Sequence, residues 1–116
     1  MTAVEGAAES AGYARLNVPE NVQVIEAPVE VHARHLGKAD FIFLDPPRAG
    51  ARQEVIAAAG EKASDMICYL SCDPVTFARD AQRLGASGWR LATLDLLDLF
   101  PNTHHVETLA SFERAR

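Results

Sequence analysis

Short apolar runs alternate with longer stretches of helical periodicity along this chain. Phe41–Leu44 and Met66–Ser71 are continuous apolar runs bounded by Asp and Pro residues, a pattern typical of strands buried on both faces of a parallel sheet. Between them, the alanine-rich stretch Arg52–Lys62 predicts a helix. Val75–Leu84 follows the second run and carries its apolar residues on one helical face, so it predicts a second helix.

The first third of the chain repeats this alternation with shorter segments. Ala3 and Val4 end a short strand with Glu5 at its carboxyl-terminal tip, and Ala7–Leu16 predicts a helix. Val22–Ile25 alternates like a strand, and Val29–Leu36 predicts a short helix closed by Gly37.

The last third contains two strands with no helix between them. Gly85 and Gly88 end the preceding helix, and Trp89–Leu97 and Val106–Phe112 predict strands joined by the loop Asp98–His105. Strands that follow each other without a crossover helix pair antiparallel. The sequence therefore predicts one α/β domain over residues 1–116, a doubly wound sheet with an antiparallel pair of strands at one edge.

Composition and charge exclude several classes of protein. The 116 residues carry 16 acidic and 11 basic side chains, a net charge of −5, so the chain lacks the basic surface of a self-sufficient nucleic-acid binder. No apolar run reaches the roughly 18 residues of a membrane span, and the N-terminus has no positively charged leader. Two cysteines are too few for a disulfide scaffold, so we expect a cytoplasmic protein without a membrane partner.

Four polar segments fall where the predicted strands end. They are Glu5–Gly6, Asp45–Arg48, Ser71–Pro74 and Phe100–Glu107. In open α/β sheets, ligands bind beyond the carboxyl ends of the strands. The sequence therefore places a candidate site at this rim.

Two cysteines and one carboxylate near this rim each have two interpretations. Cys72 lies between a strand and a helix start, where the helix dipole favours a thiolate nucleophile, although a small apolar residue filling the sheet edge is the commoner role of such a cysteine. Cys68 lies within the strand and is expected in the core. Glu107 could act as a general base or be an exposed charge on an edge strand.

The remaining candidates are an aspartate, an arginine and two histidines. Asp45 precedes two prolines, which present its carboxylate rigidly, although a turn-forming Asp is the alternative. Arg48 could clamp a phosphate or pair with a carboxylate, or lie free on the surface. His104 and His105 have no third ligand at suitable spacing, so no metal site is expected.

Four segments taken together resemble a known family. In chain order they read FLDPPRAG from Phe43, YLSCDP from Tyr69, TFARD from Thr76 and DLFPNTHHVET from Asp98. Their order and spacing closely resemble the C-terminal catalytic part of the RNA uracil-5-methyltransferases, which make 5-methyluridine in tRNA or rRNA. The resemblance extends over nearly the whole chain and implies a partial class I (Rossmann-like) methyltransferase sheet.

The resemblance also implies a mechanism and a cofactor. Cys72 matches the nucleophile that adds to uracil carbon 6, and Glu107 matches the base that removes the carbon-5 proton. Asp45 matches a residue that binds the uracil edge, with Arg48 beside it on the substrate side. Glu5 matches the acid that binds the ribose of S-adenosylmethionine, and Asp45 also lies on the cofactor side. The target base must leave its stack to reach this rim.

Two departures from the family pattern change these expectations. Asp73 stands where the family has Asn, which would raise the thiol pKa of Cys72 unless Asp73 caps the following helix. The first strand, its glycine-rich turn and the N-terminal RNA-binding part of the family have no counterpart here. We therefore expect two unpaired strand edges, next to the strand that ends near Glu5 and next to Phe41–Leu44.

Three functions follow from these observations. The first is an S-adenosylmethionine-dependent RNA uracil-5-methyltransferase, bound to RNA through the missing N-terminal part and inactive as this chain alone. The second is a non-catalytic remnant or interaction module that pairs its exposed sheet edge with a complementary chain. The third is a methyltransferase that uses Asp45–Pro47 on adenine amino groups and needs neither Cys72 nor Glu107.

Overall fold

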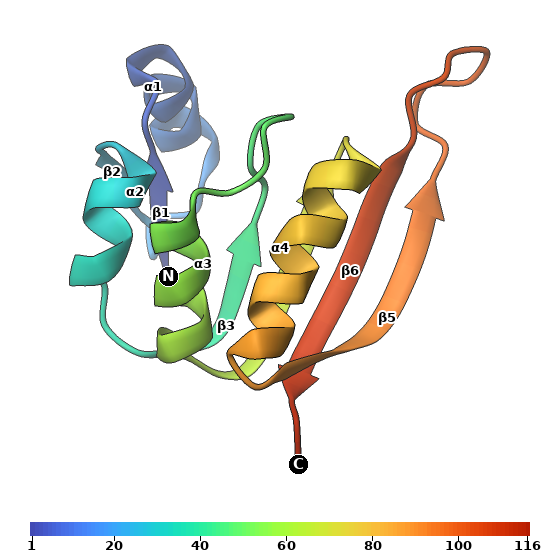
Figure 1. Cartoon of the computed structure of the whole chain (residues 1–116). Helices are drawn as coiled ribbons and strands as arrows, with labels where there is room; N and C mark the ends of the chain where they lie inside the picture. Colours follow the sequence, from blue (N-terminus) through green and yellow to red (C-terminus); the bar gives the residue numbers. More distant parts are fainter. The chain divides into compact units, whose positions relative to one another are not determined.

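A computed structural model describes all 116 residues, which fall into two compact units (Figure 1). The unit Met1–Leu36 contains a parallel pair of strands, two helices and one 3-10 turn. In chain order these are β1 (Thr2–Glu5), α1 (Ala8–Asn17), β2 (Gln23–Glu26), α2 (Val29–His32) and the turn Ala33–His35. The predicted strand–helix–strand–helix order of this unit is confirmed.

The unit Gly37–Arg116 contains a four-stranded mixed sheet in the order β3-β4-β6-β5. Its first two strands are parallel, and both remaining pairings are antiparallel. In chain order its elements are β3 (Ala39–Leu44), α3 (Gln53–Lys62), β4 (Ala63–Ser71), α4 (Pro74–Ala86), β5 (Trp89–Leu97) and β6 (Glu107–Arg114). The predicted α/β class and the antiparallel pair at one edge are therefore confirmed.

One face of this sheet forms the core. Figure 1 shows α3 and α4 on the same side of the strands, and alternate side chains of β4 and β6, among them Ile67, Tyr69 and Phe112, are buried. The Tyr69 ring of β4 meets the Phe77 ring of α4 edge-on at 5.6 Å between centroids, and Phe77 lies 6.3 Å from Phe112 of β6. Aromatic contacts of this kind add to the free energy of apolar burial, so they hold α4 against the middle of the sheet.

The only tryptophan, Trp89 at the start of β5, is buried at the opposite end of the sheet from Leu97, the last residue of that strand. Trp89 is 2% exposed, and its indole Nε1–H donates to the Gly60 carbonyl oxygen at 3.0 Å. The Arg114 guanidinium carbon lies 4.4 Å from the centre of the indole ring, and its Nη2 donates to the Gly60 and Ala63 carbonyl oxygens. This stacked cation joins the end of β6 to the junction between α3 and β4.

The opposite face of the sheet is open, which corrects two predictions. Phe41 and Phe43 of β3 are 50% and 52% exposed, Met66 is 41% exposed, and Cys68 is only half-buried. Phe41 is in register with Met66, and Phe43 with Cys68, so these side chains share the face that α3 and α4 leave uncovered. The predictions that Phe41–Leu44 is buried on both faces and that Cys68 belongs to the core are therefore wrong.

Some element ends also differ from the predictions. Val29–Leu36 is divided into α2 and the 3-10 turn, and Gly37 is not in the left-handed conformation of a helix cap. Gly85 lies inside α4, and Gly88 with φ of 83° is the residue that reverses the chain after the helix.

β1 and β3 each have one free edge. β1 pairs only with β2, and β3 pairs only with β4. Their outer backbone groups therefore make no ladder hydrogen bonds, as the sequence predicted. None of the helices is both long and apolar enough to cross a bilayer.

The loop between β3 and α3 depends on a glycine. Gly50 has φ of 78°, and its N–H donates to the Pro47 carbonyl oxygen at 2.8 Å. A Cβ at this position would collide with Arg79 and lie 2.7 Å from Asp80 Oδ2 and 3.0 Å from Thr76 Cβ. The loop thus combines a left-handed conformation with close contact to α4, and only glycine satisfies both.

We expect Gly50→Ala to lower the free energy of unfolding by about 2–3 kcal/mol, because it adds backbone strain and a steric collision. Gly85→Ala is the matched control, because Gly85 is helical and a Cβ added there would have no atom within 4 Å. It should instead stabilise by about 0.5–1 kcal/mol. Urea titration of both variants checks this, and equal effects would contradict the assigned loop packing.

Candidate functional site

Three loops meet at one end of the Gly37–Arg116 sheet. Leu44 at the end of β3 is in register with Tyr69 near the end of β4, because these strands are parallel. β6 runs antiparallel to β4 and begins at Glu107, opposite the end of β4. The loops after β3, after β4 and before β6 therefore lie at the same rim, as predicted from the sequence.

The pairing of β4 with β6 ends just short of Cys72 and Glu107. Ser71 and Thr108 form the last pair, Cys72 follows Ser71 at a bend, and Glu107 is the residue before Thr108 at the start of β6. Both residues therefore lie at the same end of these two strands. Both residues are half-buried, so neither side chain is enclosed in the core.

A hydroxyl group holds the bend at Cys72. Ser71 Oγ accepts from the Asp73 N–H at 3.1 Å and lies 2.9 Å from the Asp73 carbonyl oxygen, to which it donates. Ser71 and Asp73, the residues on either side of Cys72, are thus hydrogen-bonded to each other, which fixes the bend at Cys72. Ser71 was predicted from the sequence only as part of the rim segment Ser71–Pro74, with no role of its own. A serine at a predicted strand end is a known turn signal.

Asp73 caps the helix that follows. Its Oδ1 accepts from the Thr76 backbone N–H at 2.8 Å, and Pro74 occupies the first turn of α4. That backbone hydrogen bond lowers the pKa of Asp73 below its ordinary value, and the nearby positive charge of Arg48 contributes. Of the two alternatives left open by the sequence, capping is therefore the one observed.

Arg48 connects two of the loops. Its Nη2 lies 3.2 Å from His105 Nδ1, while its backbone oxygen accepts from Thr76 Oγ1 at 3.0 Å. A guanidinium only donates, so His105 Nδ1 is the acceptor in this contact. The His105 ring also lies against the His104 ring, with 4.2 Å between the centroids and a tilt of 39° between the planes. The His105 contact was not predicted, since it joins residues 57 positions apart.

The other sequence candidates lie at strand ends. Asp45 is the first residue after β3 and is exposed, followed by Pro46 and Pro47. Glu5 ends β1 in the other unit, where its Oε1 accepts from the Ala7 N–H at 2.7 Å. No group of three or more His, Cys, Asp and Glu side chains is arranged to hold a metal ion. The proposed role of each residue stays a prediction.

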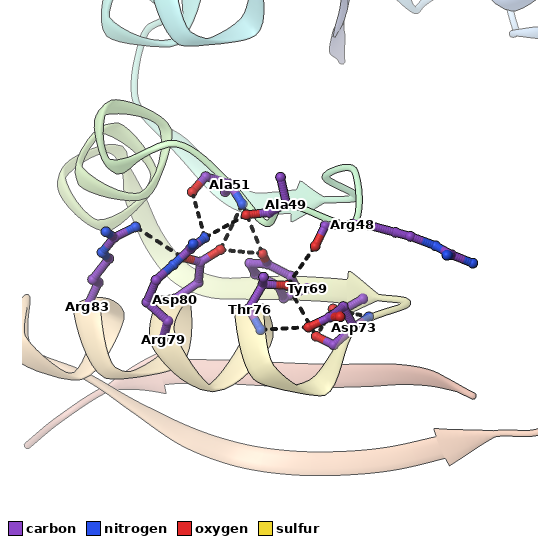
Figure 2. Close-up of polar contacts among 10 residues, drawn as sticks. Arg48, Ala49, Ala51, Tyr69, Asp73, Thr76, Arg79, Asp80 and Arg83 are labelled. Carbon is purple, nitrogen blue, oxygen red and sulfur yellow. Dashed lines mark hydrogen bonds and ion pairs between the residues drawn. The ribbon is translucent and has the colours of Figure 1, made fainter. Parts of the chain in front are cut away.

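A buried carboxylate lies beside the site and was missed from the sequence (Figure 2). Asp80 of α4 is 0% exposed; its Oδ2 accepts from Tyr69 Oη and the Ala51 N–H, both at 2.7 Å. Its Oδ1 accepts from Arg79 Nε at 3.0 Å and Arg83 Nη1 at 3.2 Å. The available signal was an acid on the apolar face of α4, three residues after Phe77.

Opposing effects set the pKa values in this network. Burial alone would raise the pKa of Asp80. The hydrogen bonds from Arg79, Tyr69 and Ala51 lower it by more than burial raises it, so the pKa of Asp80 lies below its ordinary value. Burial, together with the adjacent Asp80 carboxylate, raises the pKa of the Tyr69 phenol. Asp80 is therefore an ion and Tyr69 a neutral donor at neutral pH.

Comparison with known proteins gives consistent results. A family model described as tRNA (uracil-5-)-methyltransferase matches residues 33–115. An uncharacterized RNA methyltransferase of Gloeobacter violaceus is 41% identical over 102 residues, covering 88% of this chain and 22% of the relative. The 23S rRNA (uracil(1939)-C(5))-methyltransferase of Vibrio parahaemolyticus is 37% identical over 123 residues, covering 99% and 28%. This chain thus spans about a quarter of the length of these relatives.

Solved structures resemble the chain over almost its whole length. The tRNA (uracil-54, C5)-methyltransferase of Pyrococcus abyssi, in complex with S-adenosyl-L-homocysteine, has a TM-score of 0.80 and 31% identity. The match covers 96% of this chain and 28% of that one. A precorrin-6y C5,15-methyltransferase of Geobacter metallireducens has a TM-score of 0.81 at 17% identity, covering 98% and 66%. The expected partial class I, Rossmann-like fold is confirmed.

The Asp73 cap makes part of the stability dependent on pH. Because the folded pKa of Asp73 is lowered, its stabilisation is present above the unfolded pKa of about 3.9 and is lost as the pH falls through the folded pKa. Asp73→Asn keeps a capping side chain but removes this titration. We expect the stability of the wild type to decrease more than that of Asp73→Asn between about pH 5 and pH 2. Urea titrations across this range check it, and parallel curves would contradict the assignment.

Proposed function

Because the chain belongs to the tRNA (uracil-5-)-methyltransferase family, we propose that its rim residues methylate carbon 5 of a uracil in RNA with S-adenosylmethionine as methyl donor. The observation that supports this best is the register of β4 and β6, whose last pair, Ser71 and Thr108, lies directly beside Cys72 and Glu107 in the sequence. A thiol and a carboxylate at one rim of the sheet are the two groups that this reaction requires.

Cys72 supplies the nucleophile in this mechanism. Carbon 5 of uracil is a weak nucleophile until the Cys72 thiolate forms a bond to carbon 6, which moves the electron pair of the double bond toward carbon 5 and the carbonyl group. S-adenosylmethionine supplies an electrophilic methyl group for that carbon. Glu107 then takes the carbon-5 proton, the double bond reforms, and the thiolate leaves.

Asp45 and Arg48 bind the substrate in this proposal. The exposed Asp45 carboxylate accepts hydrogen bonds from the uracil edge, and the two prolines after it limit its movement. Arg48 keeps donors available beyond the one directed to His105, so it can bind a phosphate of the RNA. RNA remains the proposed partner, with most of its binding surface outside this chain.

Glu5 and Asp45 are the residues proposed to hold the cofactor. Glu5 Oε1 accepts from the Ala7 N–H, which leaves Oε2 to accept a hydrogen bond from a ribose hydroxyl, so its acceptor oxygens fit the group. β1, which ends at Glu5, and β3, which ends one residue before Asp45, each have one free edge. We therefore expect this chain alone to bind the cofactor weakly.

The same edges support a second candidate function. β3 has an unpaired edge, and Phe41 and Phe43 on it are half-exposed. A complementary chain that adds a strand there would pair the free backbone groups and cover this apolar surface. In this case the chain is a module for association.

Methyl transfer is not expected of this chain alone, but we expect the chain to exchange the carbon-5 hydrogen of uracil with solvent, a partial reaction that needs no cofactor. After Cys72 adds to carbon 6, carbon 5 takes up a solvent proton and Glu107 removes either hydrogen. Mass spectrometry of a short uridine-containing RNA in deuterated water measures this. Cys72→Ala should abolish exchange, and Glu107→Gln should slow it by about 10²–10⁴-fold.

Cys68→Ala is the matched control for that experiment. Cys68 is the other cysteine, and burial raises the pKa of its thiol, so its removal should leave exchange unchanged. If the wild type and Cys72→Ala exchanged the carbon-5 hydrogen at the same rate, the proposed chemistry would be contradicted.

Calorimetry with S-adenosylmethionine tests the expectation of weak binding. The chain alone should show no saturation below about millimolar concentration. Adding the segment of the Gloeobacter violaceus relative that lies outside the matched region should restore binding if a complementary chain completes the sheet. Micromolar binding by the chain alone would show that the site is already complete.

A further inference from the structure

The loop Asp45–Ala51 is attached to α4 through three residues of the helix, Thr76, Arg79 and Asp80. Thr76 Oγ1 donates to the Arg48 carbonyl oxygen at 3.0 Å, and Arg79 Nη2 donates to the Ala49 carbonyl oxygen at 2.9 Å. The Ala51 N–H donates to Asp80 Oδ2 at 2.7 Å. Figure 2 shows these contacts side by side along the helix, with the Arg48 side chain directed away from them.

We infer that Asp80 is a positioning residue that clamps the Asp45–Ala51 loop to α4 and so fixes Asp45 and Arg48 relative to Cys72. The importance of that position rests on the proposed function. Cys72 lies directly before the Asp73 cap of the same helix. The same helix therefore fixes the bend at Cys72, through its N-terminal cap, and the loop that contains Asp45 and Arg48, through its hydrogen bonds to that loop.

The geometry of the carboxylate assigns it this role and no catalytic one. Asp80 is fully buried, and each of its oxygens already accepts two hydrogen bonds, so it has no lone pair directed at a substrate. One bond comes from β4, one from the loop and two from arginines of α4. Asp80 is thus the point at which strand, loop and helix are joined.

Arg79 transmits the clamp beyond the carboxylate. While its Nε binds Asp80, its Nη2 reaches the carbonyl oxygens of Ala49 and Ala51 at 2.9 and 3.5 Å. Gly50 between them leaves no space for a side chain against Arg79 and Asp80. The loop backbone therefore packs directly on Arg79 and Asp80, and this close contact restricts its position.

Arg83 offers a matched control within the same network. Arg79 and Arg83 both bind Asp80 Oδ1, and their side chains are 42% and 35% exposed. Arg79 also donates to carbonyl oxygens of the loop, whereas the Arg83 guanidinium donates to Asp80. Replacing each arginine by Gln removes one ion pair to Asp80, but only Arg79→Gln also releases the loop carbonyl oxygens.

Trypsin cleavage after Arg48 measures how firmly the loop is held, because a protease needs the segment to detach locally. We expect Arg79→Gln to speed cleavage of the Arg48–Ala49 bond about tenfold, which corresponds to about 1.4 kcal/mol. The Ala51 amide should lose protection from hydrogen exchange to the same extent. Arg83→Gln should leave both rates within about twofold of the wild type.

Asp80→Asn is the direct variant and should exceed the effect of Arg79→Gln. If it does not fold, the pair of arginine variants still decides the inference. Equal cleavage rates in Arg79→Gln and Arg83→Gln, at equal global stability in urea, would show that the network stabilises the fold without clamping the loop, and would overturn it.

A second readout connects the clamp to the site. In the uracil exchange experiment, Arg79→Gln should raise the RNA concentration for half-maximal rate several-fold, and Arg83→Gln should leave it unchanged. The cleavage and amide measurements need no activity. Absence of exchange in the wild type would therefore refute the proposed function while leaving the clamp supported by its own data.

Discussion

The arrangement of the candidate site depends on the antiparallel pairing of β4 with β6. The pair Ser71–Thr108 sets which residues follow it on each strand, and the next ones are Cys72 and Glu107. Because side chains alternate between faces, a slip of one residue would move Glu107 to the face that α4 covers. Burial of Thr108 and Phe112, the latter in contact with Phe77 of α4, resists that slip, so the hydrophobic core maintains the register at this rim.

Helix α4 links this register to the loops around it. Its first residue follows the Asp73 cap, its middle binds the β3–α3 loop through Asp80, and its apolar side packs on Tyr69 and Phe112 through Phe77. Ionic contacts and apolar packing therefore lie on the same helix, and the charges of Arg79 and Arg83 compensate the buried carboxylate. The acidic overall composition gives no indication of this local balance.

The order of helices and strands could be predicted because prolines, glycines and apolar runs are local signals. The exposure of Phe41 and Cys68 could not, since a continuous apolar run does not reveal whether a second layer covers it. At the site, the predicted strand ends placed Cys72 and Glu107 at the same rim of the sheet, and their roles stay predictions. The Ala51–Asp80 contact joins residues 29 positions apart, and no local pattern encodes a bond of that separation.

The position of the single indole has a consequence for folding studies of this chain. Trp89 is enclosed at the base of the Gly37–Arg116 unit, between the Gly60 carbonyl oxygen and the Arg114 guanidinium, and the Met1–Leu36 unit contains no tryptophan. Its fluorescence emission therefore reports the larger unit alone. Loss of far-ultraviolet helical ellipticity that precedes the emission change would reveal that the N-terminal unit melts first, so that the two units unfold as separate cooperative bodies.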